Sequence, residues 1–233
     1  MRVSTALFAA TALMAATLAS PFALAQDKSG ENKAAAAGPK GPVAELAMAY
    51  DLYAYGVENK DALAVIAAAK IVATTPTNDI EREKETKVED GADTTEEGEG
   101  AENPPALAEM LKSATELAAG NDTLTELVKD VEAAQPRGRV RGPGKMRSGL
   151  LAGRTDIFRE NFRGGELAEV AIIGDGDTDL DLVIADENGN AICVDTSFAD
   201  KLYCSWTPAW TGPFIIAVKN QGRIRNTYYI LTN

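Results

Sequence analysis

Four aspartates at alternate positions have the clearest potential for chemistry in this sequence: Asp175, Asp177, Asp179 and Asp181. Aspartate carboxylates are ligands that calcium prefers, and several of them together can hold a hard cation. The spacing does not match an EF-hand, because Leu180 stands where that loop needs glycine. In a strand, Asp179 and Asp181 would share one face, and the other two would precede them in a loop. The pattern predicts either a calcium site or a solvated acidic loop. No other cofactor is suggested, and none is required.

The sequence offers little for catalysis. It contains no histidine, which excludes Ser-His-Asp, Cys-His and histidine–zinc chemistry. It also lacks the G-x-S-x-G motif of serine hydrolases. The formal net charge of −12 argues against a general nucleic-acid binder. We therefore expect a non-enzymatic protein that binds no nucleic acid.

Two cysteines and two tryptophans are the other candidate functional residues. Cys193 and Cys204 are the only cysteines, and we expect them to form a disulfide if the chain is exported. Trp206 and Trp210 flank a short Thr-Pro-Ala segment. We expect Trp206 to lie in the core, and Trp210 is a candidate contact for a sugar or peptide ligand.

The N-terminus has the pattern of an export signal. Arg2 is followed by an apolar run over residues 6–18, and Ala23-Leu24-Ala25 forms a signal peptidase site. This predicts a signal peptide over residues 1–25, a mature chain that begins at Gln26, and a periplasmic or extracellular location. No later segment is apolar enough to be expected to span a membrane.

The elements that must position these residues fall into a helical part and a β part. Residues 26–41 are rich in Lys, Gly and Ala and read as a flexible leader. Residues 42–135 contain apolar residues at helical spacing, which predicts four helices in two hairpins. The hairpins are similar in general arrangement to tetratricopeptide repeats, although the signature residues of that repeat are not in place.

Two charged segments divide the chain further. Residues 78–104 contain eleven acidic residues against three basic ones and interrupt the helical region. This predicts a disordered linker that serves as a spacer or as an acidic arm for a cationic partner. Residues 136–148 are basic and rich in Gly and Pro. We interpret them first as a solvated hinge, with a clamp for the acidic linker and a polyanion-binding strip as alternatives.

Residues 149–233 have the alternating pattern of short strands. Seven such segments predict an antiparallel β-sandwich: Asp156–Phe162, Leu167–Ile173, Leu180–Ala185, Ala191–Val194, Lys201–Trp206, Phe214–Lys219 and Asn226–Thr232. The fold class expected for the whole chain is therefore α+β with more than one domain, helical hairpins followed by a sandwich.

A family resemblance rests on motifs in a fixed order over about residues 150–233. They are the strand Glu166 to Ile173, then Thr178-Asp-Leu-Asp-Leu182, Asn188-Gly189, Trp206-Thr-Pro208, Thr211-Gly-Pro-Phe214, Ala217-Val-Lys-Asn220 and Tyr228-Tyr-Ile-Leu231. Together they resemble the bacterial pre-peptidase C-terminal domain. The resemblance implies a jelly-roll-like sandwich of the kind appended to secreted proteases, similar in fold to the collagen-binding domains of clostridial collagenases. Nothing upstream in this chain looks like a peptidase.

These observations lead to a first hypothesis of function. We expect an exported binding or accessory protein whose sandwich binds a protein or a polysaccharide. The alternatives are a calcium-responsive structural module and a protease-associated domain without a catalytic site of its own.

Overall fold

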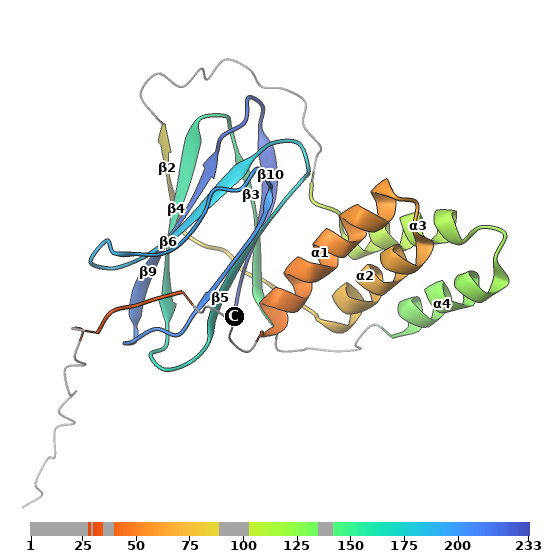
Figure 1. The fold of residues 1–233 in the computed structure, drawn as a ribbon, viewed down its shortest axis with the longest axis horizontal. Coiled ribbons are helices and arrows are strands. Elements are labelled where there is room, and N and C mark those ends of the chain that lie inside the picture. Colours follow the sequence, from red (N-terminus) through yellow and green to blue (C-terminus); the bar gives the residue numbers. More distant parts are fainter. Residues whose placement is uncertain (1–27, 29, 35–39, 89–102, 135–141) are drawn as a thin grey trace, which may run out of the picture.

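The computed structural model describes residues 28, 30–34, 40–88, 103–134 and 142–233. Two β-sheets face each other as a sandwich, and four helices lie on one side of it (Figure 1). The helices are α1 (Pro42–Glu58), α2 (Ala62–Thr74), α3 (Leu107–Ala118) and α4 (Asp122–Ala133). This confirms the expected α+β fold with four helices and a sandwich.

Each sheet has five strands. The first has the order β1-β3-β10-β5-β8, and the second has the order β2-β4-β9-β6-β7. The strands of the first sheet are β1 (Asn78–Asp79), β3 (Gly144–Leu150), β5 (Ala168–Gly174), β8 (Lys201–Trp206) and β10 (Asn226–Thr232). Those of the second are β2 (Lys84–Val88), β4 (Arg154–Phe162), β6 (Leu180–Asp186), β7 (Ala191–Asp195) and β9 (Gly212–Asn220). All the pairings are antiparallel except that of β1 with β3, which is parallel.

The space between the sheets is filled by the apolar face of each strand. Strand β9 shows the pattern most clearly, since buried and half-buried residues alternate along its whole length. This is the period of two that a strand with one face toward a core must have. Phe158, Trp206 and Phe214 are fully buried there, and burial of each such side chain contributes about 1.5–3 kcal/mol.

The helices form a second core on the outer face of the first sheet. Every residue of β5 is buried, because Val170 and Ile172 face the other sheet whereas Ala171 and Ile173 face the helices. A continuous apolar run is typical of a strand covered on both faces. The helical part therefore packs on the sandwich and forms a third layer, an arrangement that the sequence had left open.

A buried carboxylate fixes the start of α1 on this sheet. The N-cap residue Gly41 supplies no side-chain cap, and its backbone N–H donates a hydrogen bond of 2.8 Å to Oε1 of Glu169 on β5. Tyr203 on β8 donates to the same oxygen at 2.6 Å. A negative charge is favourable at a helix N-terminus, so Glu169 replaces the missing cap and holds α1 against the sheet.

The prediction of a disordered linker over residues 78–104 is wrong for its first part. Strand β1 pairs with β3, and strand β2 pairs with β4, so the chain crosses here from one sheet to the other. The side chain of Arg82 lies at this crossing, is 2% exposed, and pairs with Glu160 at 2.7 Å. Polar composition predicted disorder because it does not reveal that the partners of these charges lie on distant strands. Residues 89–102 lie outside the described residues.

The basic hinge and the flexible leader also need correction. Residues 144–148 of the expected hinge belong to β3, which lies between β1 and β10 and is bonded to both. Asn32 of the expected leader is 5% exposed and accepts a hydrogen bond of 2.8 Å from the backbone N–H of Ala209. Ala34 forms a β-bridge with Trp206. Segments that lie before residue 149 are therefore part of the sandwich. The rest of the hinge, residues 136–141, and the signal peptide lie outside the described residues.

Candidate functional site

The four aspartates of the expected calcium site lie around the β5–β6 turn and the start of β6. Hydrogen bonds from other parts of the protein reach the carboxylates of Asp175, Asp179 and Asp181. Asp175 accepts from the backbone N–H of Thr227 at 2.6 Å, Asp179 accepts from the N–H of Ala199 at 3.2 Å, and Asp181 accepts from Nε2 of Gln221 at 2.5 Å. Burial raises the pKa of Asp175 above its ordinary value, although its backbone hydrogen bonds oppose this. The described residues contain no group of three or more side chains placed to hold a metal ion. Calcium binding at these aspartates stays a prediction.

Trp210 is not a surface residue, and its expected role in ligand contact is wrong. The side chain is fully buried and stacks on Phe214, with ring centroids 6.4 Å apart. The loop that carries Trp210 folds inward at the end of the sandwich, where Asn32 binds the N–H of the preceding residue, Ala209. Trp206 lies in the core, as expected, and packs edge-on against Phe162 at 4.8 Å.

The predicted disulfide between Cys193 and Cys204 is present. It joins β7 to β8, which are edge strands of opposite sheets. The bond therefore fastens the two sheets together where no backbone hydrogen bond can do so.

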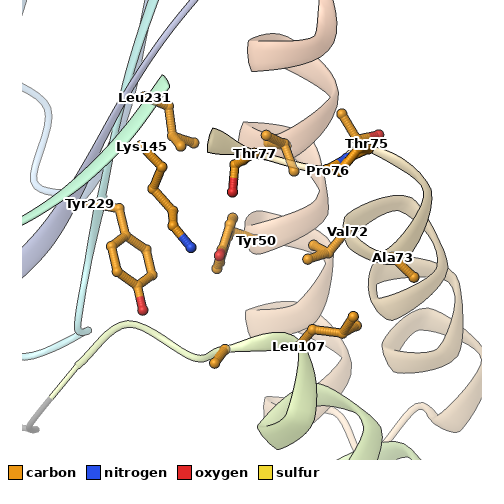
Figure 2. Close-up of a pocket in the computed structure, with 12 residues that line it drawn as sticks. Tyr50, Val72, Ala73, Thr75, Pro76, Thr77, Leu107, Lys145, Tyr229 and Leu231 are labelled. Atoms are coloured by element: carbon orange, nitrogen blue, oxygen red, sulfur yellow. The ribbon is translucent and has the colours of Figure 1, made fainter. Parts of the chain in front are cut away.

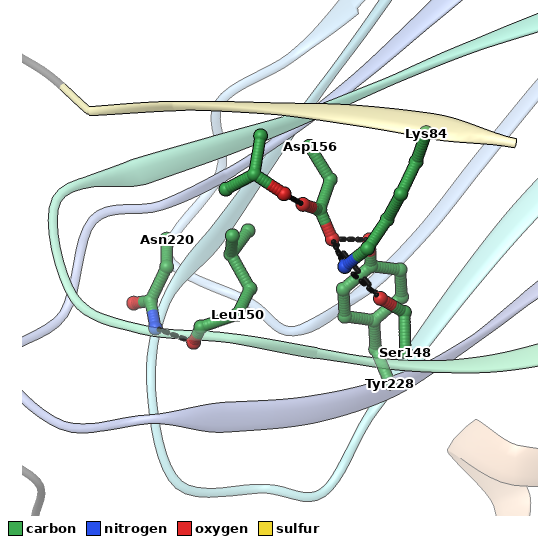
Figure 3. Close-up of polar contacts among 7 residues, drawn as sticks. Lys84, Ser148, Leu150, Asp156, Asn220 and Tyr228 are labelled. Carbon is green, nitrogen blue, oxygen red and sulfur yellow. Dashed lines mark hydrogen bonds and ion pairs between the residues drawn. The ribbon is translucent and has the colours of Figure 1, made fainter.

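A polar cluster is buried inside the sandwich around Asp156, which is fully buried (Figure 3). Its carboxylate accepts hydrogen bonds from Lys84 at 2.6 Å, Thr86 at 2.5 Å, Ser148 at 3.0 Å and Tyr228 at 2.7 Å. These four donors come from β2, β3 and β10. A buried carboxylate is tolerated when it is paired and hydrogen-bonded in this way.

This cluster brings a serine and a lysine within hydrogen-bond distance, since Nζ of Lys84 lies 2.7 Å from Oγ of Ser148. A catalytic serine would need a neutral base beside it. Here the ammonium group of Lys84 is paired with the carboxylate of Asp156, and Ser148 is only 6% exposed. The arrangement favours a structural role, which is to fasten β2 to the sandwich.

The cavity most suited to a ligand lies between the helices and the first sheet (Figure 2). We call it the helix–sandwich cavity. Its volume is about 270 Å³. Its lining is largely apolar, with Leu46, Val72, Ala73, Pro76, Ala106, Leu107 and Leu231, and its polar members are Tyr50, Thr75, Thr77, Lys145 and Tyr229. A mostly apolar cavity with a few convergent polar groups is typical of small-molecule sites.

Three of the polar residues of the lining, Tyr50, Lys145 and Tyr229, lie close together. Nζ of Lys145 lies 5.1 Å from the ring centroid of Tyr229 and 3.3 Å from Oδ1 of Asp79. The rings of Tyr50 and Tyr229 are 6.5 Å apart, and the hydroxyl of Tyr229 donates to the carbonyl oxygen of Pro104 at 3.3 Å. A cation over an aromatic face is attracted to it, so Tyr229 helps to hold the ammonium group in place.

Both tyrosines keep their protons at neutral pH. Burial raises the pKa of Tyr50 well above its ordinary value of 10.0, and Tyr229 adds to the effect. Burial also raises the pKa of Tyr229, although the positive charge of Arg147 opposes this. Both hydroxyls are therefore neutral hydrogen-bond donors.

Sequence reasoning found only part of this cavity. The helical spacing over residues 42–135 predicted the helix that carries Tyr50, and the structure confirms this helix. Sequence reasoning missed Lys145 and Tyr229. Alternation along β10 contained the signal, because Tyr228 is fully buried between the sheets and its neighbour Tyr229 must then point to the opposite face.

Comparison with known proteins adds little. No family model and no curated protein matches the chain. Among solved structures, it is similar to the CBM22-1–GH10 modules of an N-terminal endo-1,4-beta-D-xylanase of Clostridium thermocellum, complexed with xylohexaose. The identity is 9%, the match covers 37% of this chain and 24% of that chain, and the TM-score is 0.23. A likeness of this extent carries no conclusion about ligand or function. None of the helices in the described ranges is long and apolar enough to cross a membrane.

Proposed function

We propose that this protein is a binding protein that holds a small, largely apolar molecule in the helix–sandwich cavity. The observation that carries the proposal is the cavity itself, about 270 Å³ with an apolar lining and a few convergent polar groups. Its walls come from α1, the end of α2, the start of α3 and the outer face of the first sheet. The same elements also pack against one another in the core between the helices and this sheet.

The lining favours binding over catalysis. Lys145 is the only charged residue that the described part of the chain places in the lining, and the tyrosine hydroxyls remain protonated. Among the described residues, no carboxylate, thiol or imidazole lines the cavity to move a proton or attack a substrate. Residues of this kind can position a molecule and exclude water from it, and that supports a non-enzymatic role.

The cavity is also favoured over the surface of the sandwich as the site. A sugar-binding surface needs exposed aromatic rings, and Trp210, which was the candidate, is fully buried. Phe198, which is 99% exposed between β7 and β8, is the exposed aromatic ring that the described part of the sandwich offers to such a partner. One ring is a smaller contact than the lining of the cavity. The resemblance to the pre-peptidase C-terminal domain remains a hypothesis that rests on the order of the sequence motifs.

We propose further that the protein acts outside the cytoplasm. The disulfide between Cys193 and Cys204 supports this, because such bonds persist in oxidising compartments. The export signal predicts a mature chain that begins at Gln26. The intact mass of the exported protein will check this, and retention of Met1 would contradict it.

Binding in the cavity can be tested with a library of small neutral aromatic and aliphatic compounds, detected by ligand-observed NMR on the full chain. We expect weak binding of several compounds. Val72→Trp should abolish it, because the indole would fill space that Val72 leaves open on α2. Val88→Trp, at an exposed position of β2, is the matched control and should leave binding unchanged. Equal binding by Val72→Trp and the original protein would reject the cavity as the site.

A further inference from the structure

The single charge among the residues that line the helix–sandwich cavity is positive. It belongs to Lys145 on β3, although the chain as a whole carries a formal net charge of −12. We infer that the ligand of this cavity is an aromatic carboxylate, with its acid group on Lys145 and its ring between the helices and the sheet. The inference rests on the proposed function, since it names the ligand class of the same cavity.

The ammonium group of Lys145 is available to such a ligand. Its partner in the protein is Asp79, at 3.3 Å, and the side chain of Asp79 is 86% exposed. Ion pairs with exposed partners contribute little, because water screens them and the side chains lose freedom. The side chain of Lys145 is only 28% exposed, so a carboxylate that reaches it from inside the cavity would meet it in a less polar surrounding. There the attraction is stronger. The ligand would therefore compete well with Asp79.

The two tyrosines suit the rest of such a molecule. The ring of Tyr229 lies under the ammonium group, and the ring of Tyr50 lies 6.5 Å from it. The two rings therefore form an aromatic pair, and a ligand ring in the cavity can pack against this pair in an offset or edge-on arrangement. The hydroxyl of Tyr50 keeps its proton because burial raises its pKa, so it too can donate to a carboxylate. None of the described residues that line the cavity is acidic, so the lining favours an anionic ligand over a cationic one.

The volume sets the size of the ligand. A cavity of about 150 Å³ is enough to bind benzene. The volume here is about 270 Å³, which leaves room for one ring and a short acidic chain. Phenylacetate has this size and charge, and phenylacetamide has nearly the same shape without the charge. The pair therefore isolates the contribution of the carboxylate.

Isothermal titration of the full chain with phenylacetate, phenylacetamide and phenethylamine tests the inference. We expect phenylacetate to bind about tenfold more tightly than phenylacetamide, the size of one charge-assisted hydrogen bond, and phenethylamine to bind least. Lys145→Met keeps the apolar stem and should remove the preference for phenylacetate. Asp79→Asn should strengthen phenylacetate binding, because it removes the competing carboxylate. Lys112→Met, at a lysine whose side chain is 75% exposed on α3, is the control and should change nothing.

The outcomes separate the inference from the proposed function. If phenylacetate and phenylacetamide bind equally and Val72→Trp blocks both, the cavity is the site and the inference about charge is wrong. If the preference for phenylacetate survives in Lys145→Met, the inference is likewise wrong. If none of the three compounds binds but neutral compounds of the library do, the inference fails and the proposed function stands. If Val72→Trp binds the compounds unchanged, the cavity is not the site and both fail.

Discussion

The contact between Lys84 and Asp156 predicts a large cost for the removal of one charge. Lys84→Met would leave the fully buried carboxylate of Asp156 without its cationic partner, which lies at 2.6 Å. Breaking a buried ion pair in this way costs about 3–5 kcal/mol. The side chain of Lys84 is 27% exposed, and three hydroxyl donors remain on the carboxylate. We therefore expect a loss at or below the lower limit of that range, about 2–3 kcal/mol in the free energy of unfolding.

Urea denaturation followed by tryptophan fluorescence measures this loss. Trp206 and Trp210 are fully buried in the sandwich, so their emission reports its unfolding. Lys87→Met is the matched control, because Lys87 lies on the same strand, is 60% exposed and makes only a 3.8 Å surface pair with Glu85. It should cost less than about 0.5 kcal/mol. In a background that carries Asp156→Asn, Lys84→Met should cost less than about 1 kcal/mol, because no uncompensated charge remains. Equal losses for Lys84→Met and Lys87→Met would refute the view that the cluster fastens β2 to the sandwich.

Three further predictions follow from the rest of the structure. Alkylation without reduction should label neither Cys193 nor Cys204, and their double replacement by serine should cost about 3 kcal/mol, given a sequence separation of 11; labelling of both residues would contradict the bond. The pKa values of Tyr50 and Tyr228 are raised by burial above 10.0, so the folded state keeps protons that the unfolded state loses. The free energy of unfolding should then be constant just below pH 10 and fall as the pH rises above it, as denaturation at a series of pH values will show; a rise instead would contradict the sign. The calcium hypothesis predicts that millimolar calcium raises the melting midpoint by several degrees and that Asp179→Asn reduces this rise, whereas an unchanged midpoint would leave the aspartates as a solvated loop.

Local pattern was enough to predict the elements with a strong period. Strand β9 alternates along its whole length, and the sequence shows the same alternation in Phe214, Ile216 and Val218. The disulfide and the burial of Trp206 also followed from residue type and position. In each case the local sequence and the tertiary structure demand the same arrangement, which is why the prediction succeeds.

Strands β1, β2 and β3 escaped prediction because tertiary contacts decide them. Each residue of β2 is exposed, and its sequence, Lys-Glu-Thr-Lys-Val, contains one apolar residue. What holds this strand is its ladder with β4 and the inward turn of Lys84 and Thr86 to Asp156. Lys84 and Thr86 are two positions apart, so they share one face of the strand. The local sequence does not show that this face meets the buried carboxylate of Asp156.

The prediction that Trp210 contacts a ligand was wrong for a related reason. A tryptophan beside a Thr-Gly-Pro turn has the sequence context of an exposed loop residue. In the structure, the loop is covered by the segment around Asn32, which is some 180 residues away along the chain and binds the N–H of Ala209. Composition predicted a flexible leader for that segment. The burial of Trp210 could not be predicted without knowing that this segment covers its loop.

A ligand in the helix–sandwich cavity should stabilise both the helical layer and the sandwich, because the cavity lies between them. Its lining comes from α1, α2, the start of α3, and the outer face of β3 and β10, so a bound molecule would contact the helical layer and the sandwich together. A ligand that binds only when both layers are in place stabilises their association, by about 2.7 kcal/mol at a hundredfold excess over Kd. The core around the helices includes Ala171, Ile173 and Leu231 of the first sheet, and the two sheets enclose a second core between them. Ligand should therefore raise the stability of the helices as well as that of the sandwich. Backbone hydrogen exchange in α2 should slow when ligand binds, although α2 lies outside the two sheets.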